Sequence, residues 1–329
     1  MTIKRMLALS LMLMMLVGAF YVAGCAPDEV VDEPVDEPVD EPVDEPEPVD
    51  VTVVVGSKEF TEQLILGQIA ILALEHHGIP TVDETGLGGT VVVREAQERG
   101  DVDLYWEYTG TALITHLGYD EAITDPEECY RVVKEDDLER YGLVWLDYTP
   151  FNNTYTIMMR QEDADELGIV TLSDLAAAIN EGVEAPAPGV WNFATDHEYT
   201  IRDDGYPGLQ ALYGFEFDDV ITMDLGITYG ALRDGDVATA MGFATDGRIA
   251  AFDLVNLVDD LEFHPVYNCS PVIRQETLEA APQIADILNP IARALDEVTM
   301  STLNMMVDIE EYLPVEVAEM WLTEQGFID

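Results

Sequence analysis

Residues 51–78 read VTVVVGSKEFTEQLILGQIAILALEHHG and contain the first strand and helix of the fold. The apolar, β-branched run Val51–Val55 stops at Gly56 and predicts a buried strand. Apolar or small residues then recur at helical spacing until Gly78, a residue type that commonly ends helices: Phe60, Leu64, Gly67, Ile71 and Leu74. The stretch therefore predicts a buried strand that leads directly into a helix.

The same alternation continues for another seventy residues. An apolar stretch near 79–82 precedes a glycine turn, and Thr90 is a suitable N-cap for a helix that ends near Arg99. A strand over 103–106 and a helix from Thr109 follow. Because strand and helix alternate, the sequence predicts a parallel sheet that is covered by helices on both faces.

A second α/β unit begins after Pro150. Strands are predicted at 155–159, 190–193 and 237–241, and helices at 172–179 and 207–213. Near Cys269 the pattern becomes mostly helical, with periodic apolar residues over 285–295 and 315–322. Periodicity does not say which unit these last helices join, and no long internal repeat is visible.

The composition excludes one class of function and shows that the chain folds. There are 66 Asp and Glu against 14 Lys and Arg in 329 residues, a net charge of −52. Nucleic-acid binding is excluded, because phosphate contacts need clustered basic residues. Hydrophobic residues make up 48%, enough for a core. Three cysteines cannot form a disulfide framework, and we expect Cys129 and Cys269 to be buried thiols rather than a lone disulfide.

The first 24 residues are typical of an export signal. Lys4 and Arg5 precede the apolar run 6–22, and Ala23 and Gly24 lead to Cys25. This arrangement resembles a lipoprotein signal, in which Cys25 becomes the lipidated first residue. The alternative is a transmembrane anchor, but an apolar run of about 17 residues is at the short limit for spanning a bilayer. Either interpretation places the rest of the chain outside the cytoplasmic membrane and attached to it.

Residues 25–50 predict a tether. Asp28–Asp50 repeats D-E-P-V and has 12 acidic residues in 23 positions. Proline fixes φ and removes backbone donors, and like charges repel, so we expect an extended, disordered spacer. Its contour length is on the order of 70 Å.

The remaining residues, 51–329, are also strongly acidic. They hold 66 − 12 = 54 acidic and 14 − 2 = 12 basic residues, a net charge of −42. Such a surface repels itself at low salt and is tolerated where the Debye length falls to about 3 Å, near 1 M salt. We therefore expect a protein from a saline environment. Lys58 and Lys134 are the only lysines in this part of the sequence, which makes each a candidate for a specific task.

Common catalytic and cofactor motifs are missing. The sequence has no phosphate-binding P-loop, no nucleophile elbow and no H-E-x-x-H pair. The glycine turn Gly86–Thr90 can offer amides to an anion at a helix start, although a simple turn is the favoured interpretation. His76 and His77 are explained by a helix end. We expect no catalytic residues, no metal and no cofactor.

Two short stretches carry binding chemistry. Gly56–Gln63 reads GSKEFTEQ and places Lys58 where a parallel strand gives way to a helix, which is where open α/β sheets bind ligands. Leu104–Thr111 reads LYWEYTGT and concentrates aromatic and hydroxyl groups at another such junction. Tyr108 and Thr111, in the turn itself, are the residues most expected to face a ligand.

These two stretches, together with GLGGT at 86–90, resemble the substrate-binding proteins of ABC importers for glycine betaine, choline and related osmoprotectants. The likeness covers nearly all of residues 51–329. It implies an α/β fold of the two-lobed, type II periplasmic-binding-protein kind, a clamshell joined by two crossover strands. Lobe 1 would comprise 51–149 with 269–329, and lobe 2 would comprise 150–268.

The resemblance also implies a binding site. Aromatic rings enclose the quaternary ammonium, and the corresponding residues here are Tyr108, Tyr155, Phe243 and Tyr267. Basic and hydroxyl groups clamp the carboxylate, and they correspond to Lys58, Thr111 and Arg202. Relatives carry tyrosine where this chain has Phe243, which keeps a π face and loses a hydroxyl.

The implied function is capture of a quaternary-ammonium solute such as glycine betaine and its delivery to an ABC permease. The protein would be a monomer, held at the membrane by the lipid on Cys25. Two cations opposite a carboxylate favour a betaine over choline. A second hypothesis is binding of choline, carnitine, ectoine or an amino acid. A third is an extracytoplasmic enzyme that acts on such solutes.

Overall fold

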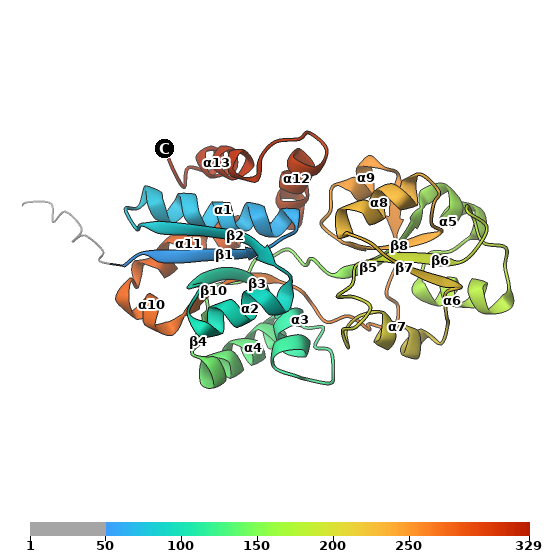
Figure 1. The fold of residues 1–329 in the computed structure, drawn as a ribbon, viewed down its shortest axis with the longest axis horizontal. Coiled ribbons are helices and arrows are strands. Elements are labelled where there is room, and N and C mark those ends of the chain that lie inside the picture. Colours follow the sequence, from blue (N-terminus) through green and yellow to red (C-terminus); the bar gives the residue numbers. More distant parts are fainter. Residues whose placement is uncertain (1–50) are drawn as a thin grey trace, which may run out of the picture. The chain divides into compact units, whose positions relative to one another are not determined.

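Strands within the described part of the chain assemble into two separate five-stranded sheets. The computed structural model describes residues 51–329, which belong to one compact unit. The predicted signal (1–24), the lipidation site Cys25 and the predicted tether (25–50) lie outside the described residues. Figure 1 shows the two sheets and the helices that flank them.

The first sheet has the strand order β2-β1-β3-β10-β4. β1 pairs in parallel with β2 and β3, whereas β10 is antiparallel to both β3 and β4. The strands of this sheet are β1 (Val53–Lys58), β2 (Thr81–Gly88), β3 (Leu104–Tyr108), β4 (Leu143–Trp145) and β10 (Cys269–Arg274). We call this sheet and the helices packed on it the first lobe.

The second sheet repeats that arrangement with the order β7-β6-β8-β5-β9. β6 is parallel to β7 and β8, and β5 is antiparallel to β8 and β9. Its strands are β5 (Tyr155–Arg160), β6 (Asn192–Thr195), β7 (Asp219–Thr222), β8 (Thr239–Phe243) and β9 (Leu254–Asn256). We call this sheet and its helices the second lobe.

The prediction of wholly parallel sheets was wrong in one respect. The fourth strand of each sheet, β10 or β5, runs against its neighbours. Each of these strands is the first one that the chain forms after passing from the other lobe, so it enters its sheet from the opposite end. Residues 269–274, which were expected to begin a mostly helical region, are one of these strands.

Helices cover both sheets and account for most of the remaining chain. Those before the second sheet are α1 (Thr61–His76), α2 (Thr90–Arg99), α3 (Thr109–Thr111), a π-helical turn (Ala112–His116) and α4 (Pro126–Tyr141). Those of the second lobe are α5 (Gln161–Leu167), α6 (Leu172–Glu181), α7 (Tyr206–Tyr213), α8 (Leu225–Arg233) and α9 (Arg248–Ala251). The last are α10 (Gln275–Ala280), α11 (Gln283–Ala294), α12 (Glu297–Asp308) and α13 (Pro314–Gln325).

The C-terminal helices join the first lobe, which periodicity could not decide. α11, α12 and α13 all pack against α1, so this helix lies between the sheet and other helices. Its apolar residues are therefore buried around most of its circumference, for example Ile65, Leu66 and Ile69. This explains why the run 63–74 is apolar almost throughout.

Two connecting segments pass between the lobes. The first crossover (146–154) follows β4, and the second crossover (257–268) precedes β10. They lie side by side and antiparallel, because Asn152 and Asn268 form a β-bridge and the Asn153 amide donates to the Tyr267 carbonyl at 3.1 Å. The two segments therefore connect the lobes as one paired strip.

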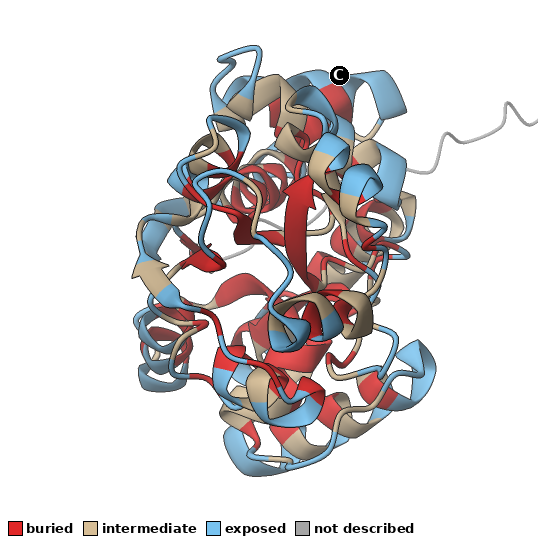
Figure 2. Ribbon diagram, turned by 90° about the vertical axis from the view of Figure 1, so that its right-hand side faces the viewer, coloured by how far each residue is buried: buried red, intermediate tan, exposed pale blue. Residues whose placement is uncertain are grey.

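The core follows the inner strands of the two sheets, which are largely buried, whereas the edge strands β2 and β7 and the outer helix faces are more exposed (Figure 2). Cys129 and Cys269 are free, buried thiols, as predicted. Within residues 51–329, no helix has the length and apolar character needed to cross a membrane.

Candidate ligand-binding site

A cavity of about 650 Å³ lies between the two sheets, at the carboxyl ends of their parallel strands. The first lobe contributes residues that follow β1, β2 and β3. The second contributes residues that follow β6, β7 and β8, and both crossovers supply one or more side chains. This is the place where open α/β sheets bind ligands, because strand ends and helix beginnings converge there.

Five aromatic rings form a continuous row along the cavity wall. The Tyr155 ring is 5.3 Å from Phe243 and 5.4 Å from Tyr267, measured between centroids. Phe60 extends the row to the first lobe, because its ring is 5.0 Å from Phe243 and 6.2 Å from Tyr108. The Tyr155 and Phe243 side chains are neighbours on the same face of the sheet, because the two residues are register partners in β5 and β8. The row therefore brings aromatic rings from both lobes to one space.

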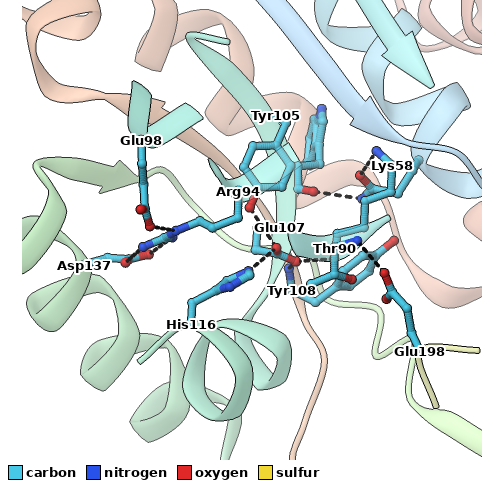
Figure 3. Close-up of polar contacts among 12 residues, drawn as sticks. Lys58, Thr90, Arg94, Glu98, Tyr105, Glu107, Tyr108, His116, Asp137 and Glu198 are labelled. Carbon is cyan, nitrogen blue, oxygen red and sulfur yellow. Dashed lines mark hydrogen bonds and ion pairs between the residues drawn. The ribbon is translucent and has the colours of Figure 1, made fainter. Parts of the chain in front are cut away.

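Lys58 lines the cavity at the end of β1 and is already paired with a carboxylate. Its Nζ donates to Glu107 Oε1 at 2.7 Å, and both side chains are buried. Glu107 Oε2 accepts from the Tyr105 hydroxyl at 2.8 Å and lies 3.0 Å from His116 Nε2 (Figure 3). Burial opposes ionisation of Glu107, but the charge of Lys58 and the contact with His116 hold its pKa well below the usual range. The Glu107 pair thus fixes the ammonium at the cavity wall.

The Lys58 ammonium retains donors for a ligand. An ammonium has three N–H groups, and residues 51–329 engage one of them, through Glu107. The same Nζ is 5.1 Å from the centroid of the Tyr108 ring. Thr111, a buried hydroxyl residue in α3, also lines the cavity. A carboxylate that enters between these residues meets both a cation and a hydroxyl.

Arg202 differs from the other predicted site residues, because it is not among those that line the cavity. Its Nε and Nη2 donate to Asp204 at 2.8 and 2.6 Å, and its Cζ lies 5.5 Å from the Tyr155 ring centroid. Asp204 in turn accepts from the Tyr267 hydroxyl at 2.7 Å. Arg202 therefore supports two rings of the row from behind.

One nitrogen of Arg202 is left over. Nη1 is buried and has no hydrogen-bond partner among the described residues. Buried donors are nearly always satisfied, so this atom marks a position where an acceptor is expected. Direct contact of Arg202 with a ligand stays a prediction.

Four carboxylates line the same cavity, namely Glu59, Asp196, Glu198 and Asp224. Asp196 directly follows β6, and burial raises its pKa above the ordinary value. Glu198 reaches across to the first lobe, where its Oε1 accepts from the Thr90 amide at 2.9 Å (Figure 3). Three of these acids, Asp196, Glu198 and Asp224, thus lie on the second lobe, and Glu198 makes a contact between the lobes.

The Glu198 contact explains the glycine turn before α2. Thr90 was predicted as the N-cap, but Gly89 holds that position and Thr90 is the first helical residue. A Cβ at residue 89 would lie 2.1 Å from Glu198 Oε1, so only glycine leaves room for the carboxylate. The turn does receive an anion, and the anion belongs to the protein itself.

Most of the predicted site residues come together in the cavity: Lys58, Tyr108, Thr111, Tyr155, Phe243 and Tyr267. The cavity is also lined by residues that were not predicted from the sequence, namely Phe60, Asn153, Asp196 and Glu198. Phe60 lies in the GSKEF stretch, so its proximity to Lys58 was available as a signal. Asp196 and Glu198 had no such signal, because acidic residues are common throughout this chain.

Comparison with known proteins places the chain in a family. Residues 51–324 match the family described as the substrate binding domain of ABC-type glycine betaine transport system. The chain is similar to a glycine-betaine-binding protein of Pseudomonas aeruginosa, with 42% identity over 84% of this chain and 89% of the relative. It is also similar to glycine betaine-binding protein YehZ of Escherichia coli, with 36% identity over 84% of this chain and 91% of the relative.

A solved structure supports the same assignment. A crystal structure described as a glycine betaine/carnitine/choline ABC transporter superposes with a TM-score of 0.69 and 29% identity, covering 85% of this chain and 99% of the other. The chain therefore belongs to the family of substrate-binding domains of ABC-type glycine betaine transport systems.

Membership confirms three predictions. The fold is a two-lobed α/β binding protein, the function is solute binding for an ABC permease, and the protein is not an enzyme. Substrate-binding proteins of ABC importers work outside the cytoplasmic membrane, which agrees with the expected location.

Proposed function

We propose that this protein captures glycine betaine, or a closely similar quaternary-ammonium zwitterion, between its two lobes. The single observation that carries the proposal is the row of five aromatic rings that runs from the first lobe to the second beside Lys58. A trimethylammonium group cannot donate a conventional hydrogen bond, so π faces are the groups suited to holding it. We further propose that lobe 1 comprises 51–149 with 269–329 and lobe 2 comprises 150–268.

In this proposal the two ends of the ligand have different partners. Tyr108, Tyr155, Phe243 and Tyr267 enclose the ammonium, and Phe60 closes the row between the lobes. Lys58 and Thr111 hold the carboxylate. Arg202 supplies the second cation, through its unpartnered Nη1, when the second lobe closes on the ligand.

The energies involved are adequate for a useful affinity. Each aromatic face contributes about 0.5–2 kcal/mol toward a cation, and charge-assisted hydrogen bonds to the carboxylate add about 1.5–3 kcal/mol each. A micromolar complex requires about 8 kcal/mol after the costs of association. Three or four faces and two cationic donors together contribute about 4.5–14 kcal/mol before those costs, so a micromolar complex needs most of these contacts at once.

The acidic wall restricts the ligands that can enter. Glu59, Asp196, Glu198 and Asp224 repel net anions, whereas zwitterions and cations are accepted. Choline, carnitine and ectoine meet this condition and form the alternative ligand set. The solved relative described as a glycine betaine/carnitine/choline ABC transporter favours keeping choline and carnitine as candidates.

We also propose the setting in which the protein works. A lipid on Cys25 and the acidic tether 25–50 would hold a monomer near its permease, outside the cytoplasmic membrane. The 54 acidic residues of 51–329, against 12 basic ones, suit a saline medium. Buried ion pairs such as Lys58–Glu107 are screened less than surface charges, so binding persists there.

Titration calorimetry in molar potassium chloride tests the ligand assignment. We expect glycine betaine to bind with micromolar or better affinity, and choline to bind at least tenfold more weakly because it lacks a carboxylate for Lys58. Equal affinities would remove the carboxylate clamp from the proposal. If the folded protein gave no heat of binding with either compound, the quaternary-ammonium assignment would be rejected.

A further inference from the structure

Glu62 is a buried carboxylate that the binding scheme above does not use. It is the second residue of α1, in the first lobe, and its side chain is closed off from solvent. Oε1 accepts from the Tyr108 hydroxyl at 2.7 Å and from Asn153 Nδ2 at 2.9 Å. Oε2 accepts from the Thr245 hydroxyl at 2.6 Å and from Asn304 Nδ2 at 3.1 Å.

The four donors come from four separate parts of the chain. Tyr108 ends β3 in the first lobe, and Asn153 lies in the first crossover. Thr245 follows β8 in the second lobe, two residues after Phe243, and Asn304 belongs to α12. A carboxylate has about four acceptor sites, so this one is saturated. Its position thereby fixes four donors, including one in each lobe.

Within residues 51–329 no arginine or lysine forms an ion pair with this carboxylate, which is unusual for a buried acid. Among the described residues its printed contacts are all to neutral groups, and burial raises its pKa while the four hydrogen bonds act against that rise. The site at the start of a helix also favours negative charge. The Glu62 carboxylate is therefore held in place by its four hydrogen-bond donors. If one lobe shifted against the other at this point, these donors would lose the acceptor that they share.

Glu62 lies beside two cavities between the lobes. The ligand cavity lies on one side, and a smaller cavity of about 180 Å³, lined by Glu62, Thr245 and Asn304, lies next to it. Asn304 also donates to the Thr245 carbonyl at 3.1 Å, so the second-lobe loop is held twice at this point. Motion of one lobe against the other is therefore restrained here, beside the paired crossovers.

We propose that the Glu62 carboxylate is the pivot of lobe closure and the residue that positions the two halves of the aromatic row. It ties the Tyr108 ring of the first lobe to the loop that follows Phe243 in the second. This inference rests on the proposed capture of a ligand between the lobes. Because a ligand binds only the fraction of molecules in the competent arrangement, loosening the pivot lowers the apparent affinity.

The test uses two variants that act on opposite ends of one bond. Glu62→Gln keeps the size but turns one acceptor into a donor. Thr245→Val keeps the shape and removes only the hydroxyl that the second lobe contributes, so it remains informative if Glu62→Gln fails to fold. Thr228→Val is the matched control, because the buried Thr228 hydroxyl bonds within the second lobe, to Leu225 and Met241 carbonyls at 2.7 and 3.1 Å.

The measurement is the distance between the lobes without ligand, followed by affinity. Spin labels are attached through Glu139→Cys in α4 and Glu166→Cys in α5, both at exposed positions. Cys25→Ser removes the remaining thiol outside the described residues. Cys129 and Cys269 are buried and escape labelling. We expect Glu62→Gln and Thr245→Val to broaden the distance distribution and to weaken glycine betaine and choline alike, by about tenfold. Thr228→Val should keep the wild-type distribution.

Either of two results would overturn the pivot. One is an unchanged distance distribution in both variants, whatever happens to affinity. The other is a broadening by Thr228→Val equal to that by Thr245→Val, which would show a general loss of packing. The distance arm needs no ligand, so it decides on the pivot even if the wild-type protein binds neither compound and the proposed function fails.

Discussion

The two lobes share one sheet order and carry different chemistry at equivalent positions. The order β2-β1-β3-β10-β4 in the first lobe matches β7-β6-β8-β5-β9 in the second. An aromatic residue ends the third strand of both orders, Tyr108 in one and Phe243 in the other. The second strand ends in Lys58 in the first lobe and is followed by Asp196 in the second. Aromatic groups are thus shared, whereas charge is divided between the lobes.

This arrangement determines how the site would hold a zwitterion. A ligand between the lobes meets aromatic rings from both, Lys58 on the wall of the first lobe, and Asp196, Glu198 and Asp224 on the wall of the second. The orientation of the ligand is therefore set by charge, and its enclosure by the rings. Substitutions of charged residues and of aromatic residues separate these two contributions.

Removal of the buried cation from either lobe should have the largest effect. Lys58→Met leaves Glu107 without its partner, and Arg202→Met does the same to Asp204, so each should lower the free energy of unfolding by about 3–5 kcal/mol. Denaturant melts measure this loss, and Lys58→Met/Glu107→Gln and Arg202→Met/Asp204→Asn should recover most of it.

Ligand binding by the two stabilised double variants then tests whether both cations contact the carboxylate of the ligand. If both cations contact the carboxylate, each variant should weaken glycine betaine at least tenfold more than choline, in calorimetry. A selective loss for Lys58 together with an equal loss for Arg202 would assign the clamp to the first lobe alone. Arg202 would then act only through the rings that it supports.

An aromatic residue from each lobe can be removed in turn. Tyr155→Ala and Tyr108→Ala should each weaken binding by about 1–2 kcal/mol, or 5- to 30-fold, because each deletes one π face. Tyr155→Phe keeps the face and should bind as the wild type does. An unchanged affinity for Tyr155→Ala would show that the rings do not enclose the ligand. Tyr108→Ala should also lower stability, because Glu62 loses a donor.

The contact between Glu198 and the start of α2 should have a smaller effect. Glu198→Gln removes the charge that the helix N-terminus favours, so we expect a loss of about 0.3–1 kcal/mol in affinity if the contact assists closure. Glu59→Gln removes the same charge from an exposed position on the cavity wall and is the control. If calorimetry gave equal changes in affinity for Glu198→Gln and Glu59→Gln, the effect of Glu198 would be explained by its charge alone and not by its contact with α2.

The smallest effect concerns pH and the first lobe alone. Burial lowers the pKa of His116 against the pull of Glu107, so the folded protein favours the neutral ring. A depressed pKa gives stability that is present above the unfolded value, about 6.5, and is lost as the pH falls. The stability advantage of the wild type over His116→Gln should therefore shrink below about pH 6.5 in denaturant melts. An advantage that grows on acidification would reverse this assignment.

Sequence patterns foresaw most of the strands and helices that line the cavity, because those elements begin or end at conspicuous motifs, but β7 and α8, which also line it, were not predicted. β1 with α1, the limits of α2 near Thr90 and Arg99, and β5 were all placed within a few residues. The antiparallel strand β10 was missed, because a buried strand of six residues after a long segment has no period of its own. The equal topology of the lobes was invisible, since it is a repeat of backbone arrangement and not of residues.

The candidate site divides in the same way. Lys58, Tyr108 and Thr111 were placed by local motifs, and all three line the cavity. The state of charge around them could not be foreseen, because Glu107 and Asp204 pair with the two cations only through the fold. The hydrogen bonds of Glu62 reach as far along the chain as Asn304, and no short-range sequence pattern links positions so far apart.

The strand β10 has a consequence for the order in which the molecule is built. Its partners β3 and β4 precede the second lobe in the chain, and β10 follows that lobe. A nascent chain therefore has all of its second sheet before it has the strand that lies between β3 and β4. The second lobe can assemble first as an inserted domain, while the first lobe waits for residues 269–274 and brings together segments about 160 positions apart, a slow closure.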